Sequence, residues 1–264
     1  MPLHVEVRGS GPPLVLLHGF TQTGRLWGPF GAAMAQAHTL IAVDLPGHAG
    51  SDVARADLPE TAALVQQAVT GAIGDSACAL LGYSLGARVA LHVTLGTDLA
   101  LSRLVLIGAT GGLEDPAARQ RRRESDERLA DDLEGSGDVD GFIARWVSGP
   151  MFAGLAAAAQ PEERRRNRAA GLASSLRLAG TGTQEPLWDQ LPALTVPLLA
   201  LAGTDDTRFA AHALRLAKSV PNGVASLVPG GGHAVHLAQP ALVSRLVGHW
   251  LGSPTTDAPA GYRP

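Results

Sequence analysis

The sequence contains one cysteine among its 264 residues, and it contains no long apolar run. One cysteine cannot form an intrachain disulfide, so Cys78 is expected to be a small buried side chain. The N-terminus, MPLHVEVRG, lacks a basic segment followed by an apolar one, and no stretch is apolar for long enough to cross a bilayer. We therefore expect a cytoplasmic protein without a membrane partner.

Charge of one sign is not in large excess either, because the formal net charge is only -3 at pH 7. The electrostatic field of a protein with so small a net charge gives no reason to expect nucleic acid or an anionic membrane as a partner. Any use of positive charge must therefore be local. An internal repeat is also missing, and the length and the 45% of hydrophobic residues are enough for one large domain.

Short apolar runs alternate with helical patterns along most of the chain. The runs predict strands at residues 4–8, 14–17, 39–43, 79–82, 104–107, 198–202 and 225–228, and the patterns predict helices at 59–72, 85–95, 210–220 and 240–251. This alternation indicates an α/β protein with a mostly parallel central sheet flanked by helices. The turn residues GSGPP between the first two strands predict a hairpin.

Between residues 111 and 185 the apolar runs stop, and the sequence becomes helical and charged. Because core strands resume only at residue 198, we predict a helical insertion over one edge of the sheet, which we call the lid segment. Residues 1–110 and 186–251 would then form the core. Residues 252–264 lack periodicity and are expected to form a flexible tail.

The stretch GYSLG places Ser84 between Gly82 and Gly86, where a predicted strand meets a predicted helix. This is the nucleophile-elbow pattern, in which small flanking residues permit a strained turn that exposes the serine hydroxyl. In an open parallel sheet, ligands bind at the carboxyl ends of the strands, which is where this serine lies. The pattern and its context predict an activated serine.

A serine hydroxyl needs a base to take its proton, and the base needs a carboxylate to orient it. His233 follows the last predicted strand in a glycine-rich loop and is the best candidate for the base. Asp205 and Asp206 both follow the preceding strand, and their spacing does not choose between them; either can instead cap the next helix. His18 is expected to be structural. His236 lies three residues after His233, whereas helical metal ligands usually lie four apart, so no metal site is expected.

Two further features concern the groups that could bind a substrate beside the serine. An oxyanion hole in this architecture uses two backbone N–H groups, and those of Phe20 and Leu85 are the candidates. Arg88 lies at i+4 from Ser84, so its guanidinium can share the face that presents the serine and can bind a carboxylate through two hydrogen bonds. The alternative is that Arg88 is tied to a core carboxylate or extends to the surface.

Several stretches between about residues 13 and 251 carry a family resemblance. LLHGFTQTGRLW, DLPGHAGSD and GGGHAVHLAQP resemble the α/β-hydrolase superfamily widely, and GYSLGARVAL, ARWVSGPMF and AGTGTQ followed by LWDQL are more discriminating. Within the superfamily, the chain resembles the 2-succinyl-6-hydroxy-2,4-cyclohexadiene-1-carboxylate (SHCHC) synthases of menaquinone, or vitamin K2, biosynthesis. Three positions depart from that family: Ala49 and Ala87 stand where glycine is usual, and Ala238 replaces a glutamate.

The resemblance implies a catalytic triad of Ser84, Asp206 and His233. Asp206 is preferred because the family places its acid three residues after a glycine and three before a phenylalanine. The resemblance also implies a lyase that eliminates pyruvate from 2-succinyl-5-enolpyruvyl-6-hydroxy-3-cyclohexene-1-carboxylate, with the serine acting as a base and without a cofactor or metal. The alternatives are a carboxylesterase or carbon–carbon bond hydrolase that uses Ser84 as a nucleophile, and a catalytically silent small-molecule receptor.

The resemblance further implies a small anionic carboxylate substrate. It favours Tyr83, Arg88, Arg122 and Trp146 as substrate contacts. Most other arginines of the lid segment are expected to face solvent beside acidic residues. Monomer and homodimer both remain open.

Overall fold

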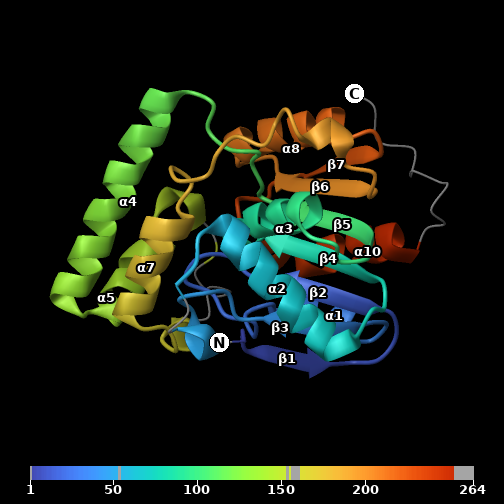
Figure 1. The fold of residues 1–264 in the computed structure, drawn as a ribbon, viewed down its shortest axis with the longest axis horizontal. Helices are drawn as coiled ribbons and strands as arrows, with labels where there is room; N and C mark the ends of the chain where they lie inside the picture. Colours follow the sequence, from blue (N-terminus) through green and yellow to red (C-terminus); the bar gives the residue numbers. More distant parts are fainter. Residues whose placement is uncertain (1, 53–54, 153–154, 156–160, 253–264) are drawn as a thin grey trace.

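A seven-stranded sheet forms the centre of the computed structural model, which describes residues 2–52, 55–152, 155 and 161–252 (Figure 1). The strand order is β1-β3-β2-β4-β5-β6-β7, and β1 alone is antiparallel to its neighbour. The strands are β1 (Val5–Arg8), β2 (Pro13–Leu17), β3 (Thr39–Val43), β4 (Cys78–Tyr83), β5 (Leu101–Ile107), β6 (Leu198–Gly203) and β7 (Gly223–Val228). The prediction of an α/β protein with a mostly parallel sheet is confirmed.

The hairpin predicted for the first two strands is wrong. β1 pairs with β3, with Val5 opposite Val43, so β3 lies between β1 and β2. The physical reason lies in the composition of β2, whose residues Leu14 to Leu17 are all fully buried. A strand buried on both faces belongs in the interior of a parallel sheet, and β2 pairs there with β3 and β4. The half-exposed β1 takes the edge.

Helices cover both faces of the sheet. One face packs against α2 (Leu58–Ile73), α3 (Leu85–Gly96) and α8 (Thr207–Ser219), and the other packs against α1 (Gly28–Met34), the short α9 (Val235–Ala238) and α10 (Pro240–Gly252). Successive residues of β2 alternate between the two cores, because strand side chains point to opposite faces. The sequence analysis missed α1 and α9. Short 3-10 turns occur at Ala49–Ser51, Pro150–Phe152 and Leu191–Ala193.

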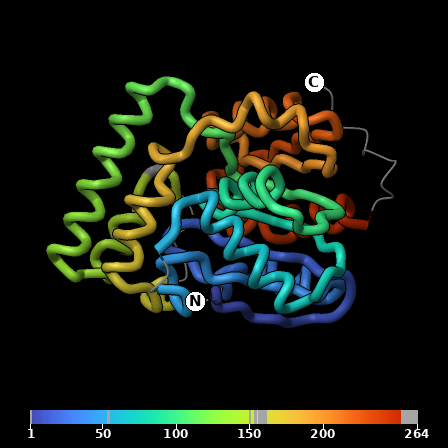
Figure 2. The backbone as a smooth tube through the Cα atoms, in the orientation of Figure 1, coloured from blue at the N-terminus to red at the C-terminus, as the bar shows by residue number. Residues whose placement is uncertain are grey.

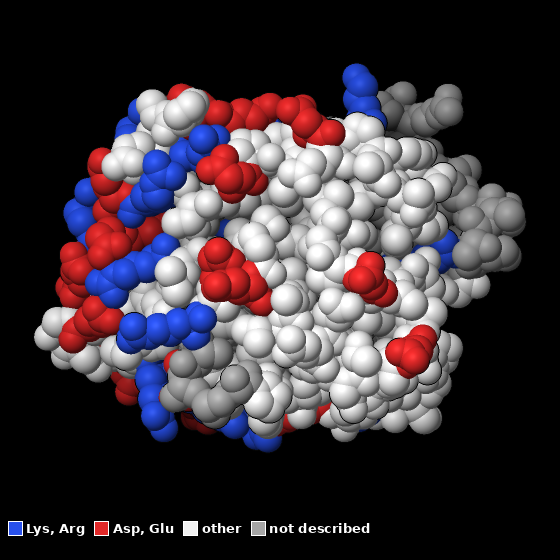
Figure 3. Space-filling model, in the orientation of Figure 1, with Lys and Arg blue, Asp and Glu red and all other residues white. Residues whose placement is uncertain are grey.

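Among the described residues between β5 and β6, inside the lid segment, four α-helices occur: α4 (Pro116–Ser136), α5 (Val139–Ser148), α6 (Pro161–Arg164) and α7 (Ala169–Ala179). α4 and α7 lie side by side at one end of the molecule (Figures 1 and 2). They enclose a small core of their own, which includes Leu133, Phe142, Leu172 and Leu176. Figure 3 shows that side chains of both charges gather over this end, whereas most of the surface over the core shown there is uncharged.

Within the described part of the chain, no helix has both the length and the apolar character needed to span a bilayer. The tail predicted at 252–264 lies outside the described residues apart from Gly252, which ends α10.

Candidate active site

Ser84 occupies a sharp turn between β4 and α3. Its backbone has a φ of 53° and a ψ of -107°, a conformation that L-residues rarely adopt. The flanking glycines are required by close packing: a Cβ on Gly82 would lie 2.3 Å from the Gly86 carbonyl oxygen, and a Cβ on Gly86 would lie 2.0 Å from that of Leu17. The strained turn lifts the serine hydroxyl out of the sheet and into a pocket.

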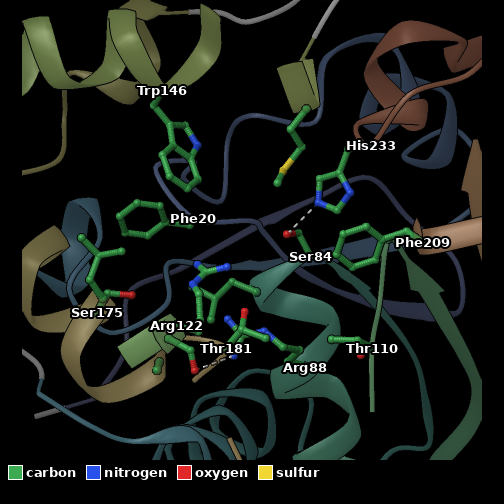
Figure 4. A pocket seen from close by; sticks show the side chains of 16 residues that line it. Phe20, Ser84, Arg88, Thr110, Arg122, Trp146, Ser175, Thr181, Phe209 and His233 are labelled. Atoms are coloured by element: carbon green, nitrogen blue, oxygen red, sulfur yellow. Dashed lines mark hydrogen bonds between the residues drawn. The ribbon is translucent and has the colours of Figure 1, made fainter. Parts of the chain in front are cut away.

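The structure brings Ser84, His233 and Asp206 into one hydrogen-bonded chain (Figure 4 shows the first two). Ser84 Oγ lies 3.0 Å from His233 Nε2, and His233 Nδ1 lies 2.8 Å from Asp206 Oδ2. Because a carboxylate only accepts hydrogen bonds, the imidazole proton sits on Nδ1, which leaves Nε2 free to accept the serine proton. The neighbouring Asp205 is exposed and accepts a hydrogen bond from the hydroxyl of Thr204 instead.

Asp206 combines the two roles that the sequence left open. Its Oδ1 accepts a hydrogen bond from the Phe209 N–H at 3.3 Å and caps α8, while Oδ2 holds His233. Burial alone would raise the pKa of the Asp206 carboxyl, but the hydrogen bond and charge of His233, with the Phe209 N–H, lower it below its usual value. The carboxylate is therefore held ionised, as the partner of a base should be.

The two proposed oxyanion donors, the N–H groups of Phe20 and Leu85, belong to residues near Ser84. Leu85 is the first residue of α3, so its N–H has no acceptor within the helix. Phe20 lies on the loop after β2, where the amides on either side of it are already engaged: Gly19 N donates to Gln22 Oε1 at 2.9 Å and Thr21 N to His48 Nε2 at 3.3 Å. Both Phe20 and Leu85 line the pocket that contains Ser84.

His18 and His236 lie behind the site. His18 Nε2 accepts a hydrogen bond from Leu45 N at 3.0 Å, which ties the loop after β2 to the loop after β3. The ring of His236 packs against Tyr83, with 4.4 Å between ring centroids, and burial lowers its pKa to about 3. Among the described residues, no group of three or more histidine, cysteine, aspartate or glutamate side chains is arranged to hold a metal ion.

Two arginines line the main pocket on one side of Ser84 (Figure 4). Arg88 is buried, and its Nη1 donates to the Gly180 carbonyl at 3.3 Å. Burial, together with the charge of Arg122, lowers the pKa of Arg88 to about 9 despite the opposing charge of Asp126. Arg122 Nε donates to both oxygens of the buried Asp126 at 2.9 Å. Two guanidinium groups thus share one buried carboxylate, which leaves this side of the pocket positively charged.

A third arginine, Arg164, lines a smaller pocket that adjoins the first at Ser84. It is fully buried, and burial lowers its pKa to about 10 although Tyr83 opposes the shift. Its Nη1 donates to Thr21 Oγ1. The sequence analysis did not select Arg164, because the adjacent exposed Arg165 and Arg166 give the same signal in the run ERRRNR. Only the fold distinguishes the buried member of the run.

Trp146 and Tyr83 contribute to the pocket walls. Trp146 lines both pockets and contacts the Phe20 ring edge-on, with 5.1 Å between centroids. Tyr83 lines the smaller pocket, and burial raises the pKa of its phenol. Its hydroxyl has no hydrogen-bond partner among the described residues, so it can donate to a bound ligand.

Comparisons with known proteins give a consistent result. The family described as "Alpha/beta hydrolase family" matches residues 14–246. A Klebsiella pneumoniae protein named 2-succinyl-6-hydroxy-2,4-cyclohexadiene-1-carboxylate synthase is 33% identical, over 92% of this chain and 94% of that protein. The structure of MenH from S. aureus matches with a TM-score of 0.87 and 26% identity, over 94% of this chain and 97% of that one. The esterase RhEst1 from Rhodococcus matches with a TM-score of 0.74 and 26% identity, over 95% of this chain and 94% of the esterase.

Proposed function

Since the chain belongs to the alpha/beta hydrolase family, we propose that it eliminates pyruvate from 2-succinyl-5-enolpyruvyl-6-hydroxy-3-cyclohexene-1-carboxylate to give SHCHC. One observation carries the proposal: an activated serine lies between Arg88 and Arg122 on one side and Arg164 on the other. Such a pocket suits a substrate with carboxylates at separate positions, because guanidinium groups bind carboxylates with two hydrogen bonds and fixed geometry. A neutral ester would offer these guanidinium groups no carboxylate to bind.

The proposed reaction uses the triad as a base. His233 takes the proton of Ser84, and the serine oxygen removes a proton from the substrate ring. The electron pair released in the ring expels the enolpyruvyl oxygen, which leaves a conjugated cyclohexadiene and the enolate of pyruvate. The enolate gains at carbon the proton that His233 had taken, which gives pyruvate and restores the neutral histidine. No water is consumed, and no bond forms between Ser84 and the substrate.

The other residues of the site have defined tasks in this proposal. The N–H groups of Phe20 and Leu85 stabilise the negative charge that develops as the proton is removed. Tyr83 and Trp146 line the pocket around the ring, and Arg122 and Arg164 hold carboxylates alongside Arg88. The reaction needs neither metal nor cofactor. We further propose that the protein acts in the cytoplasm, as a monomer or homodimer.

The test is a turnover assay with the enolpyruvyl substrate and two variants. The parent protein should release pyruvate, and Ser84→Ala and His233→Ala should each lose turnover, because either change removes part of the proton path. Arg165→Ala, at the exposed position that follows Arg164 at the end of α6, is the control and should retain activity. Full activity of Ser84→Ala would exclude the serine as the base.

A further inference from the structure

Thr21 follows the oxyanion candidate Phe20 in the chain and is held in an unfavourable conformation. Its φ is 65°, which is uncommon for any residue other than glycine and more so for a β-branched one. The backbone of such a residue stays in the left-handed region only when the surrounding structure fixes it there.

All three polar groups of Thr21 are engaged. Its N–H donates to His48 Nε2, its hydroxyl accepts from Arg164 Nη1, and its carbonyl accepts from Asn167 Nδ2 at 2.8 Å. The second and third partners come from the lid segment, more than 140 positions along the chain. The loop that carries Phe20 is therefore fastened from outside the core.

Asn167 is the residue best placed to carry this constraint. It is buried, and its Nδ2 also donates to the Arg164 carbonyl at 2.8 Å, while its Oδ1 accepts from Ala49 N at 3.0 Å. The orientation of the amide is chemically fixed, because the opposite orientation would place Oδ1 against two carbonyl oxygens and Nδ2 against an N–H. One side chain thus joins the Phe20 loop, the end of α6 and the turn after β3.

We infer that Asn167 is a positioning residue for the oxyanion hole, acting through Thr21 on the N–H of Phe20. The peptide that follows Phe20 ends at the Thr21 N–H, which His48 holds, and the next peptide begins at the Thr21 carbonyl, which Asn167 holds. Together the two hydrogen bonds fix Thr21 from both sides, which limits rotation of the segment that aims the Phe20 N–H. The inference rests on the proposed use of that N–H as an oxyanion donor. It holds whether Ser84 acts as a base or as a nucleophile.

The test compares Asn167→Asp and Asn167→Ala with the parent protein. Asn167→Asp keeps the shape and the acceptor for Ala49 N, but it sets a carboxylate oxygen against two carbonyls. We measure kcat and KM for pyruvate release and the rate constant for phosphorylation of Ser84 by diethyl p-nitrophenyl phosphate. This neutral probe needs the oxyanion hole but no arginine. Asn222→Asp, an exposed asparagine far along the chain, is the control.

Both variants should lower kcat and the phosphorylation rate constant by about 10- to 100-fold, since loss of one oxyanion donor costs about 100- to 1000-fold. KM should change by less than about threefold. The final extent of labelling counts folded sites, so a slower rate at unchanged extent separates positioning from unfolding. A rate constant within about twofold of the parent overturns the inference. A parent that is labelled normally but releases no pyruvate overturns the proposed function alone.

Discussion

The guanidinium of Arg88 lies one helical turn from Ser84, where a charged group is costly to bury. Its described neighbours compensate the charge only in part, because Asp126 is already bound through both oxygens to Arg122. A substrate carboxylate would complete the pairing. The buried charge of Arg88 beside Ser84 thus indicates a substrate that carries a carboxylate.

Arg88→Ala should lower kcat/KM for pyruvate release, because a buried contact with the substrate carboxylate is lost. The loss of transition-state stabilisation should be about 2–4 kcal/mol. Labelling of Ser84 by the neutral phosphate ester should change much less. Arg121→Ala, which removes an arginine with a largely exposed side chain on α4, is the matched control. An equal loss in the charged and neutral reactions would show that Arg88 supports the elbow instead of the substrate.

Ala49 is one of the residues at which the chain departs from the family it resembles, and the structure shows the consequence. Its φ is 39°, in the region that favours glycine. Ala49→Gly should therefore raise the free energy of unfolding by about 0.5–1 kcal/mol, because relief of the strain outweighs the added freedom of the unfolded chain. Urea denaturation measures the change. Ala32→Gly, at an exposed position inside α1, should instead destabilise by a similar amount, and a loss of stability in Ala49→Gly would contradict the reasoning.

Among the elements, α4 and α7 are joined by one arginine. The guanidinium of Arg177 on α7 makes hydrogen bonds of 2.7 Å to Glu127, Asp131 and Glu134, which lie along one stripe of α4. Single ion pairs at a surface contribute little, but this arginine also relieves repulsion among three neighbouring carboxylates. The contact holds together the part of the lid segment that carries Arg122.

Arg177→Gln should lower the free energy of unfolding by about 1 kcal/mol at low ionic strength, and added salt should reduce the difference because it screens the carboxylates. Urea titrations at low and high salt measure both values. Arg145→Gln removes a single exposed pair with Asp132 and should change stability by less than about 0.5 kcal/mol. A loss in Arg177→Gln that does not depend on salt would indicate a packing role.

The elements also show how far sequence reasoning extends. The buried strands were predictable because apolar runs such as that of β2 satisfy burial on both faces. Ser84 and His233 were predictable because each follows a strand, whereas the choice of Asp206 over Asp205 came from the family resemblance. The pairing of β1 with β3 was not predictable, because the turn residues GSGPP permit a hairpin with β2 and only the strand order of the folded sheet excludes it. Arg164 and Asn167 were not predicted either, because their roles arise from contacts with residues more than 110 positions away.

The molecule as a whole buries several neutral histidines around its site. His18, His48 and His236 are fully buried, and burial lowers the pKa of each, to about 3 for His48 and His236. When the pH is below 6.5, the ordinary pKa of histidine, these side chains bind protons in the unfolded chain but stay neutral in the folded protein. Stability must therefore fall as the pH decreases from about 6.5 towards about 3.

Urea midpoints at pH 8 and pH 5 measure this effect. Each histidine with a folded pKa near 3 should account for about 2 kcal/mol of the stability lost at pH 5. His236→Leu should reduce the loss by about that amount, whatever its effect at pH 8. His249→Gln, at an exposed position, is the control and should retain the loss seen in the parent. An unchanged loss in His236→Leu would contradict the reasoning.

The choice between elimination and hydrolysis concerns the whole reaction, and pyruvate alone does not decide it. Hydrolysis of the enolpyruvyl group would also release pyruvate, but it would leave an oxygen on the ring and form no diene. The deciding measurement is the ratio of conjugated diene to pyruvate formed from the enolpyruvyl substrate by the purified protein. Elimination with Ser84 as base predicts one diene for each pyruvate. Pyruvate without diene, or no turnover at all, would contradict it.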